Sequence, residues 1–283
     1  MKKKILVTGG AGFIGFHLIK RLINNGIEVI AIDNLNSYYS VELKNARLYE
    51  LYKLKGNFKF HSGDIEDYNF LEDIFEKYQP EIVVNLAAQA GVRYSIKNSK
   101  KYFKSNLLGF YNLIEFSKNS KVKFFYYAST SSVYGLNKKL PYEEKDPVNH
   151  PSQFYASTKR ANELMAHSYS SIYGLNCTGV RFFTVYGPWG RPDMAPMIFS
   201  RKIFLKQPIT LFNYGNMSRD FTYIDDIVEG TYLCSLKPPN LSLESNNKSI
   251  KVPNKIFNIG FGKPVNLDYF VELLENQLSI SAL

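Results

Sequence analysis

The sequence predicts an α/β fold in which a doubly wound parallel sheet carries a smaller second lobe. Short apolar runs rich in β-branched residues alternate with longer amphipathic stretches, and a glycine-rich turn joins the first run to the first such stretch. The alternation becomes irregular after about residue 185, which predicts the second lobe. Strands that are apolar almost throughout indicate a sheet covered by helices on both faces.

The first part of the chain contains the expected elements of this sheet. Apolar runs predict strands at Lys4–Val7, Glu28–Ile32, Phe58–His61, Ile82–Leu86, Lys123–Ala128 and Cys177–Arg181. Amphipathic stretches predict helices at Gly12–Asn25, Tyr68–Tyr78, Lys101–Lys118 and Ser152–Tyr173. We therefore expect residues 1–185 to form a nucleotide-binding domain.

Residues 186–283 are expected to form mainly a substrate-binding lobe, with segments that return to the large domain. Four prolines between positions 188 and 208 interrupt the regular pattern. Lys237–Pro253, rich in Pro, Asn, Ser and Lys, is expected to be a surface loop, and Leu267–Leu278 to be a helix. Because the chain stops soon after that helix, the lobe is expected to be shortened at its C-terminal end.

Composition and charge narrow the class of protein. No apolar run approaches the ~20 residues that a membrane-spanning helix needs, and glycines break the short apolar run after the N-terminal lysines, unlike a signal peptide. Cys177 and Cys234 lie far apart without metal-ligand spacing, so free thiols in a reducing compartment are expected. These features predict a cytoplasmic protein with neither a metal site nor a membrane partner.

The net charge of +10 alone does not choose between a nucleic acid and a small anionic substrate. The lysines are scattered, with short clusters only at 2–4, 100–101 and 138–139, and no recognition motif is present. A basic surface also raises the local concentration of a small anion. We therefore expect no nucleic-acid partner.

A glycine-rich turn at residues 8–15, Thr-Gly-Gly-Ala-Gly-Phe-Ile-Gly, follows the first strand and opens the first helix. A backbone that approaches a pyrophosphate closely needs residues without Cβ, and a helix N-terminus offers unpaired N–H groups. Gly9, Gly12 and Gly15 suit that task, although a tight strand–helix turn without a ligand could also use them. The position of the motif favours a Rossmann-type dinucleotide site.

Asp33 ends the second strand, 18 residues beyond Gly15. A carboxylate there can accept hydrogen bonds from both adenosine ribose hydroxyls and would repel a 2′-phosphate, so NAD is preferred to NADP. A solvated Asp that caps a loop is the plain alternative. Asp64 follows the third strand, and two interpretations of it stay open: a contact with the adenine edge, or no role in binding.

A candidate catalytic pair, Tyr155 and Lys159, is spaced by one turn of a predicted helix. A nearby cation favours phenolate and lowers a pKa that is normally about 10. This spacing is common by chance, but a run of hydroxyls at 129–132 ends a preceding strand, where ligands bind in parallel sheets. A hydroxyl from that run could bridge a substrate oxygen and Tyr155.

Together these motifs resemble the extended short-chain dehydrogenases/reductases that act on nucleotide sugars. The resemblance covers essentially the whole chain and includes Asn-Leu-Ala-Ala-Gln-Ala at 85–90 and Arg-Phe-Phe-Thr-Val-Tyr-Gly-Pro at 181–188. It implies an NAD-dependent enzyme that is a homodimer. It also implies a cofactor site formed by Gly9, Gly12, Phe13, Ile14, Gly15, Asp33, Asn34, Asp64, Ile65, Leu86, Ala87, Ala88, Tyr155 and Lys159.

Within this family, residues 187–196 and 215–226 look like those of UDP-glucuronate 4-epimerases. The resemblance implies that Thr130 and Tyr155 form the acid/base pair and that Lys159 orients the cofactor. It also implies a substrate site made of Ser131, Ser132, Thr184, Arg191 and Arg219. The plain alternatives are a surface arginine in a Pro-rich loop for position 191 and an ion pair with Asp220 or Asp225 for position 219.

The residues that follow Thr130 bear on the type of reaction. Family members that dehydrate the sugar carry an Asp-Glu pair there and decarboxylating members a Glu, whereas this chain has Ser131-Ser132. Simple epimerisation of UDP-glucuronate and UDP-galacturonate through a 4-keto intermediate therefore fits best. The alternatives are a 4-epimerase of a neutral UDP-sugar, UDP-glucose or UDP-N-acetylglucosamine, and an inactive, shortened NAD-binding relative.

Overall fold

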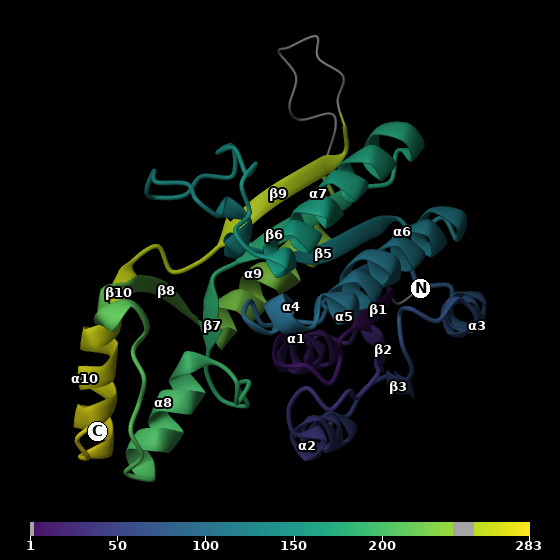
Figure 1. Cartoon of the computed structure of the whole chain (residues 1–283). Helices are drawn as coiled ribbons and strands as arrows, with labels where there is room; N and C mark the ends of the chain where they lie inside the picture. Colours follow the sequence, from purple (N-terminus) through teal and green to yellow (C-terminus); the bar gives the residue numbers. More distant parts are fainter. Residues whose placement is uncertain (1–2, 240–251) are drawn as a thin grey trace.

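A seven-stranded parallel sheet forms the centre of the molecule, as a computed structural model of residues 3–239 and 252–283 shows (Figure 1). The strand order is β3-β2-β1-β4-β5-β6-β9. The strands are β1 (Lys4–Thr8), β2 (Glu28–Asp33), β3 (Phe58–Ser62), β4 (Ile82–Asn85), β5 (Phe124–Thr130), β6 (Cys177–Phe182) and β9 (Asn254–Ile259). Because the order reverses between β1 and β4, the carboxyl ends of these strands border a crevice where ligands bind in such sheets.

Helices cover both faces of this sheet, as the apolar strands predict. The first face packs against α1 (Phe13–Asn24), α2 (Val41–Tyr52) and α9 (Ile224–Leu236). The second face packs against α3 (Tyr68–Tyr78), α6 (Gly109–Asn119) and α7 (Phe154–Tyr173). The predicted doubly wound parallel α/β fold is therefore confirmed.

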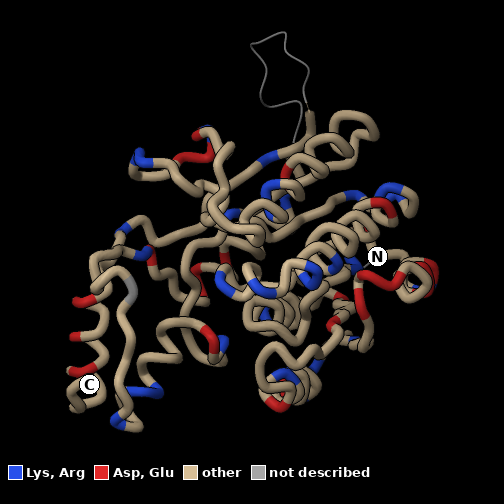
Figure 2. Tube along the Cα trace, in the orientation of Figure 1, with Lys and Arg blue, Asp and Glu red and all other residues tan. Residues whose placement is uncertain are grey.

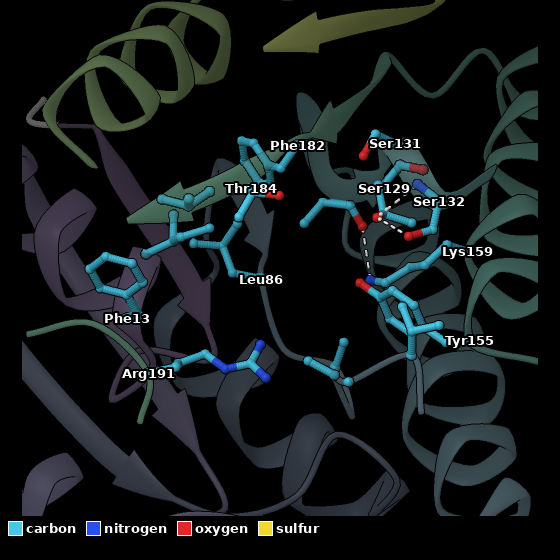
Figure 3. A pocket seen from close by; sticks show the side chains of 18 of the residues that line it. Phe13, Leu86, Ser129, Ser131, Ser132, Tyr155, Lys159, Phe182, Thr184 and Arg191 are labelled. Carbon is cyan, nitrogen blue, oxygen red and sulfur yellow. Dashed lines mark hydrogen bonds between the residues drawn. The ribbon is translucent and has the colours of Figure 1, made fainter. Parts of the chain in front are cut away.

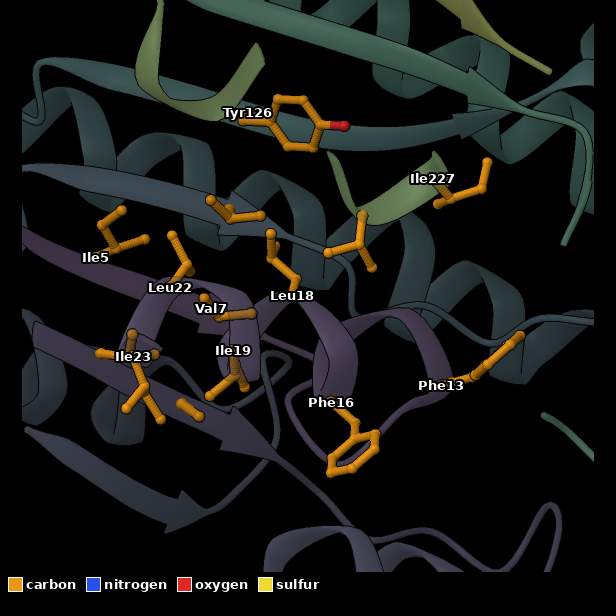
Figure 4. Packing of buried hydrophobic residues seen from close by; sticks show 14 of the residues in the cluster. Ile5, Val7, Phe13, Phe16, Leu18, Ile19, Leu22, Ile23, Tyr126 and Ile227 are labelled. Atoms are coloured by element: carbon orange, nitrogen blue, oxygen red, sulfur yellow. The ribbon is translucent and has the colours of Figure 1, made fainter. Parts of the chain in front are cut away.

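The junction of β1 and α1 carries the core that fixes the nucleotide-binding turn (Figure 4). Val7 of β1 and the α1 residues Leu18 and Leu22 are fully buried in one cluster. Their spacing on the helix places them on one apolar side. Burial of each such side chain stabilises the fold by about 1.5–3 kcal/mol, so the start of α1 is held firmly against the sheet.

Two helical segments differ from the sequence prediction. α2 was not predicted, because its buried face carries Lys44 and Arg47 beside Leu48 and Leu51 and so lacks a plain apolar stripe. The predicted helix 101–118 is divided into α5 (Ser99–Tyr102), a π-helical turn at Phe103–Leu108, and α6. Asn106 in that turn hydrogen bonds to the backbone of Gln89 and to Thr158 Oγ1, contacts that tie the widened turn to β4 and α7.

The second part of the chain forms a small sheet with strand order β10-β8-β7. Its strands are β7 (Thr184–Tyr186), β8 (Ser218–Tyr223) and β10 (Pro264–Asn266), and its helices are α8 (Ala195–Phe204) and α10 (Leu267–Leu278). α9 and β9 pack against or within the large sheet. We propose that residues 1–185 and 186–283 form the two domains. The predicted loop at 237–253 lies mostly outside the described residues.

Charged residues are distributed over many elements rather than gathered on one (Figure 2). Within the described residues, no helix is long and apolar enough to cross a membrane. The same residues contain no group of three or more metal-ligating side chains. Both cysteines are free thiols, and burial raises the pKa of Cys177 to about 12, which makes that thiol unreactive.

Candidate active site

A cleft of about 1630 Å³ opens at the carboxyl ends of the central strands and extends to the small sheet. Every residue that the sequence assigned to a catalytic, cofactor or substrate role lines it. They are Gly9, Gly12, Phe13, Ile14, Gly15, Asp33, Asn34, Asp64, Ile65, Leu86, Ala87, Ala88, Thr130, Ser131, Ser132, Tyr155, Lys159, Thr184, Arg191 and Arg219. The roles of these residues remain proposals; what the structure gives is their common location.

The glycine turn leaves no room for a side chain at Gly9 or Gly15. Gly9 has a φ of +69°, and a Cβ on it would lie 2.8 Å from the backbone nitrogen of Ala87. A Cβ on Gly15 would lie 2.2 Å from the carbonyl oxygen of Gly9. The backbone therefore folds closely on itself at the N-terminus of α1, whose free N–H groups suit a pyrophosphate. These residues fit a dinucleotide.

Asp33 lies beside this turn and is held by backbone donors. Its carboxylate accepts hydrogen bonds from the backbone N–H of Ala11 at 3.2 Å and of Leu35 at 2.9 Å. Burial raises the pKa of Asp33, and the charge of Lys44, whose Nζ lies 3.9 Å away, opposes that rise. Each carboxylate oxygen keeps a lone pair that can accept from a ribose hydroxyl.

The candidate catalytic pair, Tyr155 and Lys159, comes from α7 and faces the end of β5 (Figure 3). Tyr155 and Lys159 lie on the side of α7 that lines the cleft, opposite the hydroxyls of Ser129, Ser131 and Ser132. The Lys159 Nζ donates to the carbonyl oxygen of Ala128 at 2.9 Å. The Thr130 hydroxyl accepts a hydrogen bond from the backbone N–H of Ser132, which fixes its direction at the strand end.

The expected depression of the Tyr155 pKa is wrong for the protein alone. Burial raises the pKa of Tyr155, and the charge of Arg191 and the Thr130 hydroxyl oppose that rise. Burial also lowers the pKa of Lys159 to about 8. Both groups are desolvated, which disfavours their charged forms more than their neighbours favour them. Arg191, not Lys159, is the cation that lowers the phenol pKa most.

Arg191 enters the cleft from the loop between β7 and α8, across from Tyr155 (Figure 3). Its side chain is 20% exposed, which rules out a free surface arginine. Its Nε and one Nη form a bidentate ion pair with Asp193, and Asp193 also accepts a hydrogen bond from the Tyr38 hydroxyl at 3.0 Å. The remaining guanidinium nitrogen is left to the cleft.

Thr184 and Arg219 lie on adjacent strands of the small sheet. Thr184 on β7 pairs with Phe221 on β8, two residues after Arg219. Among the ion pairs of the described part of the chain, none joins Arg219 to Asp220 or Asp225. Asp220 instead accepts hydrogen bonds from the backbone N–H groups of Phe261 and Gly262. The geometry therefore leaves the Arg219 guanidinium to the cleft.

Sequence reasoning missed several residues of the cleft. Lys44 and Tyr38 line it, and Lys44 lies beside Asp33, although the local stretch 33–40 contains no cation. A signal was present, because Lys44 and Arg47 share the i, i+3, i+4, i+7 face of α2 with Leu48 and Leu51. Basic residues on an otherwise apolar face indicate a buried partner. For Tyr38 the sequence holds no comparable signal.

A Rossmann-type turn, a carboxylate beside it that is able to accept from ribose hydroxyls, and a Tyr–Lys pair in the same cleft as a Thr define a class of site. It suits an enzyme that moves a hydride and a proton between a nicotinamide cofactor and a carbinol or carbonyl. The comparisons with known proteins agree. The NAD-dependent epimerase/dehydratase family matches residues 5–260, so the chain belongs to that family.

Relatives and solved structures narrow this class. The chain is 50% identical to Protein CapI of Staphylococcus aureus and 44% identical to a probable UDP-glucuronate 4-epimerase of Rhizobium meliloti, over 99% of this chain and 84% of each relative. Two solved structures each cover 99% of this chain and 84% of their own, at 33% identity. They are the Bacillus cereus UDP-glucuronic acid 4-epimerase with substrate and NAD, TM-score 0.84, and the Thermotoga maritima UDP-glucose 4-epimerase, TM-score 0.83. The chain is an NAD-dependent nucleotide-sugar epimerase.

Proposed function

We propose that the protein interconverts UDP-glucuronate and UDP-galacturonate by inverting C4 of the sugar. The choice of a sugar with a carboxylate rests on Arg191, a cation that reaches into the same cleft as Tyr155 and Thr130. A guanidinium binds a carboxylate better than an ammonium does, because its parallel N–H groups match the two oxygens. The similarity to UDP-glucuronate 4-epimerases supports the same assignment.

The proposed chemistry uses Tyr155 and Thr130 at the sugar O4. When bound, NAD would supply the acceptor for the C4 hydride and the donor for its return to the opposite face. Tyr155 accepts the O4 proton in its phenolate form, which the charge of Arg191 favours, as C4 is oxidised, and it donates that proton back when the 4-keto sugar is reduced. Thr130, fixed at the end of β5, hydrogen bonds to O4. Lys159, anchored to the Ala128 carbonyl, holds the cofactor ribose.

Arg191 and Thr184 are assigned a second task in this reaction. A 4-keto glucuronate is a β-keto acid that loses CO₂ when its carboxylate is aligned for C–C cleavage. Contacts from the Arg191 guanidinium and the Thr184 hydroxyl would hold the carboxylate away from that alignment. Arg219 is placed two residues along β8 from the partner of Thr184 and would pair with the diphosphate.

A neutral UDP-sugar is the second candidate, and one observation favours it. Asp193 already occupies two nitrogens of the Arg191 guanidinium and offsets its charge. Because Asp193 offsets this charge, Arg191 attracts a carboxylate less strongly, while its remaining N–H groups can still donate to a sugar hydroxyl. The similarity to a UDP-glucose 4-epimerase is also consistent with this candidate.

The deciding experiment mixes the protein and NAD separately with UDP-glucuronate, UDP-glucose and UDP-N-acetylglucosamine and follows the sugar products by NMR. We expect turnover of UDP-glucuronate to exceed that of the neutral sugars. For Arg191→Ala, kcat/KM for UDP-glucuronate should fall ~10- to 100-fold, the loss of a charged hydrogen bond, and that for UDP-glucose should fall less.

Arg201→Ala is a matched control for this test, because Arg201 is exposed on α8 of the same lobe. It should leave both substrates unaffected. Equal losses for the two sugars in Arg191→Ala would remove Arg191 from carboxylate recognition and favour the neutral substrate. Bound NAD without turnover of any of the three sugars would refute the proposed reaction.

We also propose that two copies of the chain pair through α7 and the segment 103–111. These adjacent elements expose large apolar side chains, a feature typical of protein interfaces. They are Phe103, Leu108, Tyr111, Leu164, Ile172 and Tyr173. Light scattering after chromatography should give twice the chain mass of 32.5 kDa, and Leu164→Arg should shift it towards one chain mass. A single-chain mass for the unaltered protein would exclude this pairing.

A further inference from the structure

The loop at residues 187–193, which carries Arg191, is held mainly by residues of the nucleotide-binding half. His17 Nε2 on α1 lies 3.0 Å from the carbonyl oxygen of Pro188. The Tyr38 hydroxyl donates to Asp193 at 3.0 Å. A third contact, from Arg47 on α2 to the carbonyl oxygen of Trp189, lies between these two. The loop is therefore docked onto the other half at three successive points.

Arg47 differs from His17 and Tyr38 because it contacts both the loop at 187–193 and the glycine turn. One Nη donates to the carbonyl oxygen of Ala11 in the glycine turn at 2.9 Å, and the other donates to Trp189 O at 2.5 Å. The Tyr39 hydroxyl lies 2.8 Å from the first Nη. The side chain is fully buried and does not line the cleft. It thus lies behind the wall of the cleft, where it contacts the glycine turn and the loop but not a molecule bound in the cleft.

The chemistry of guanidinium explains why an arginine stands here. Its nitrogens lie in one rigid plane, so a single group fixes the separation of two carbonyl oxygens that belong to different halves of the molecule. Its Nε has no hydrogen-bond partner among the described residues, and burying this unpaired N–H group is an expense in free energy. A residue that served only for packing would not need such a group. Methionine would fill the same space without that expense.

The docked loop also adopts a backbone conformation that needs support. Trp189 has a φ of +61°, which is unfavourable for a residue with a side chain. Its ring packs against Phe16 of α1, with centroids 5.4 Å apart. Arg191 follows two residues later, so a movement of the Trp189 carbonyl changes the direction from which Arg191 enters the cleft.

We propose that Arg47 is a positioning residue that sets Arg191 for the sugar carboxylate by joining the Trp189 carbonyl to the Ala11 carbonyl of the glycine turn. The proposal rests on the proposed recognition of UDP-glucuronate by Arg191. Arg47 contacts neither the sugar nor the cofactor, and its effect on the substrate passes through the loop. Its loss should therefore resemble a partial loss of Arg191.

The test compares Arg47→Met with Arg47→Lys, and with Arg21→Met as a matched control. Arg21 lies on α1 and forms a partly exposed ion pair with Glu229, away from the loop. With NAD saturating, Arg47→Met should raise KM for UDP-glucuronate about tenfold, the loss expected for one charged hydrogen bond, with a smaller change for UDP-glucose. Arg47→Lys should recover part of this loss, and Arg21→Met should behave as the unaltered protein.

A double-mutant cycle separates positioning from a general structural role. If Arg47 acts through Arg191, Arg47→Met should cause little further loss in an Arg191→Ala background. Full additivity of the two losses, or an equal rise in KM for both sugars, would overturn the proposal. Should Arg47→Met fail to fold by circular dichroism, the same cycle with Arg47→Lys decides.

Trp189 provides a readout that does not depend on turnover, because it is the single tryptophan of the chain. Release of the loop in Arg47→Met should increase quenching of its fluorescence by acrylamide and shift its emission to the red. Unchanged quenching would show that Arg47 does not hold the loop. If the unaltered protein turns over no UDP-sugar, the proposed function fails, whereas this measurement still tests whether Arg47 holds the loop.

Discussion

The glycine turn and the loop at 187–193 both bring main chain to the cleft, but they are fixed in opposite ways. The turn is held by its own compact backbone, in which Gly15 packs against the carbonyl of Gly9. The loop is held by side chains that reach it from α1 and α2, such as His17 and Arg47. The cofactor end of the site is therefore built locally, and the sugar end depends on contacts distant in sequence.

The largest effect is expected at Tyr155, because it is the proposed acid/base group of the reaction. Tyr155→Phe removes the proton acceptor and should lower kcat by ~10²–10⁴. Bound NAD, measured after acid release from the protein, should stay near the level of the unaltered enzyme. Near-normal turnover of this variant would exclude Tyr155 as the acid/base group.

A side chain in the glycine turn should have the next largest effect. A Cβ at Gly15 would lie 2.2 Å from the Gly9 carbonyl oxygen, so Gly15→Ala must displace the turn, and we expect NAD affinity to fall about 100-fold. Gly26→Ala is the control, because a Cβ there meets nothing within 4 Å and only its φ of +73° is unfavourable. Equal NAD affinities for the two variants would contradict the view that this turn is sterically fixed.

The Lys159 ammonium predicts a pH dependence of stability. Burial lowers its pKa to about 8, while the unfolded chain keeps the ordinary value of 10.5. Between these values the unfolded state binds more protons, so this group makes the folded state more stable as pH rises. The free energy of unfolding of the unaltered protein minus that of Lys159→Met should increase by about 2 kcal/mol from pH 8 to pH 10. A constant difference would show that Lys159 titrates normally.

The smallest effect is expected where the loop keeps its backbone contacts. His17 and Arg47 contact carbonyl oxygens of Pro188 and Trp189, which any side chain at these positions retains. Trp189→Phe loses part of the packing with Phe16, worth about 1 kcal/mol for an aromatic pair, so kcat/KM should fall less than tenfold. A loss as large as that of Arg47→Met would show that the ring, not the carbonyl, holds the loop.

The sequence predicted the elements whose signals are local. The apolar strands, the glycine turn and the amphipathic α7 can each be recognised from a short segment of the sequence. All the site residues assigned from them line the cleft. The run of hydroxyls at 129–132 pointed to the end of a strand, and the family resemblance singled out Thr130 within it. The helix at Leu267–Leu278 was predicted with its observed bounds.

What the sequence did not predict depends on distant partners. Arg47 joins residues 36 positions before it and 142 positions after it, and no local pattern carries such information. The predicted direction of the Tyr155 pKa shift was wrong, because the spacing to Lys159 indicates that the two side chains share one face of a helix but not that they are buried. The π-helical turn at Phe103–Leu108 likewise depends on the tertiary contacts of Asn106.

The pairing of β7 with β8 fixes the distance between the backbones of two residues of the proposed substrate site. Thr184 and Arg219 lie on neighbouring strands with a register offset of two residues, so main-chain hydrogen bonds fix the separation of their Cα atoms. Along a strand two residues span about 6.6 Å, and the strands lie about 4.8 Å apart. If Arg219 binds the diphosphate as proposed, UDP-sugar analogues with one phosphate fewer should bind more weakly.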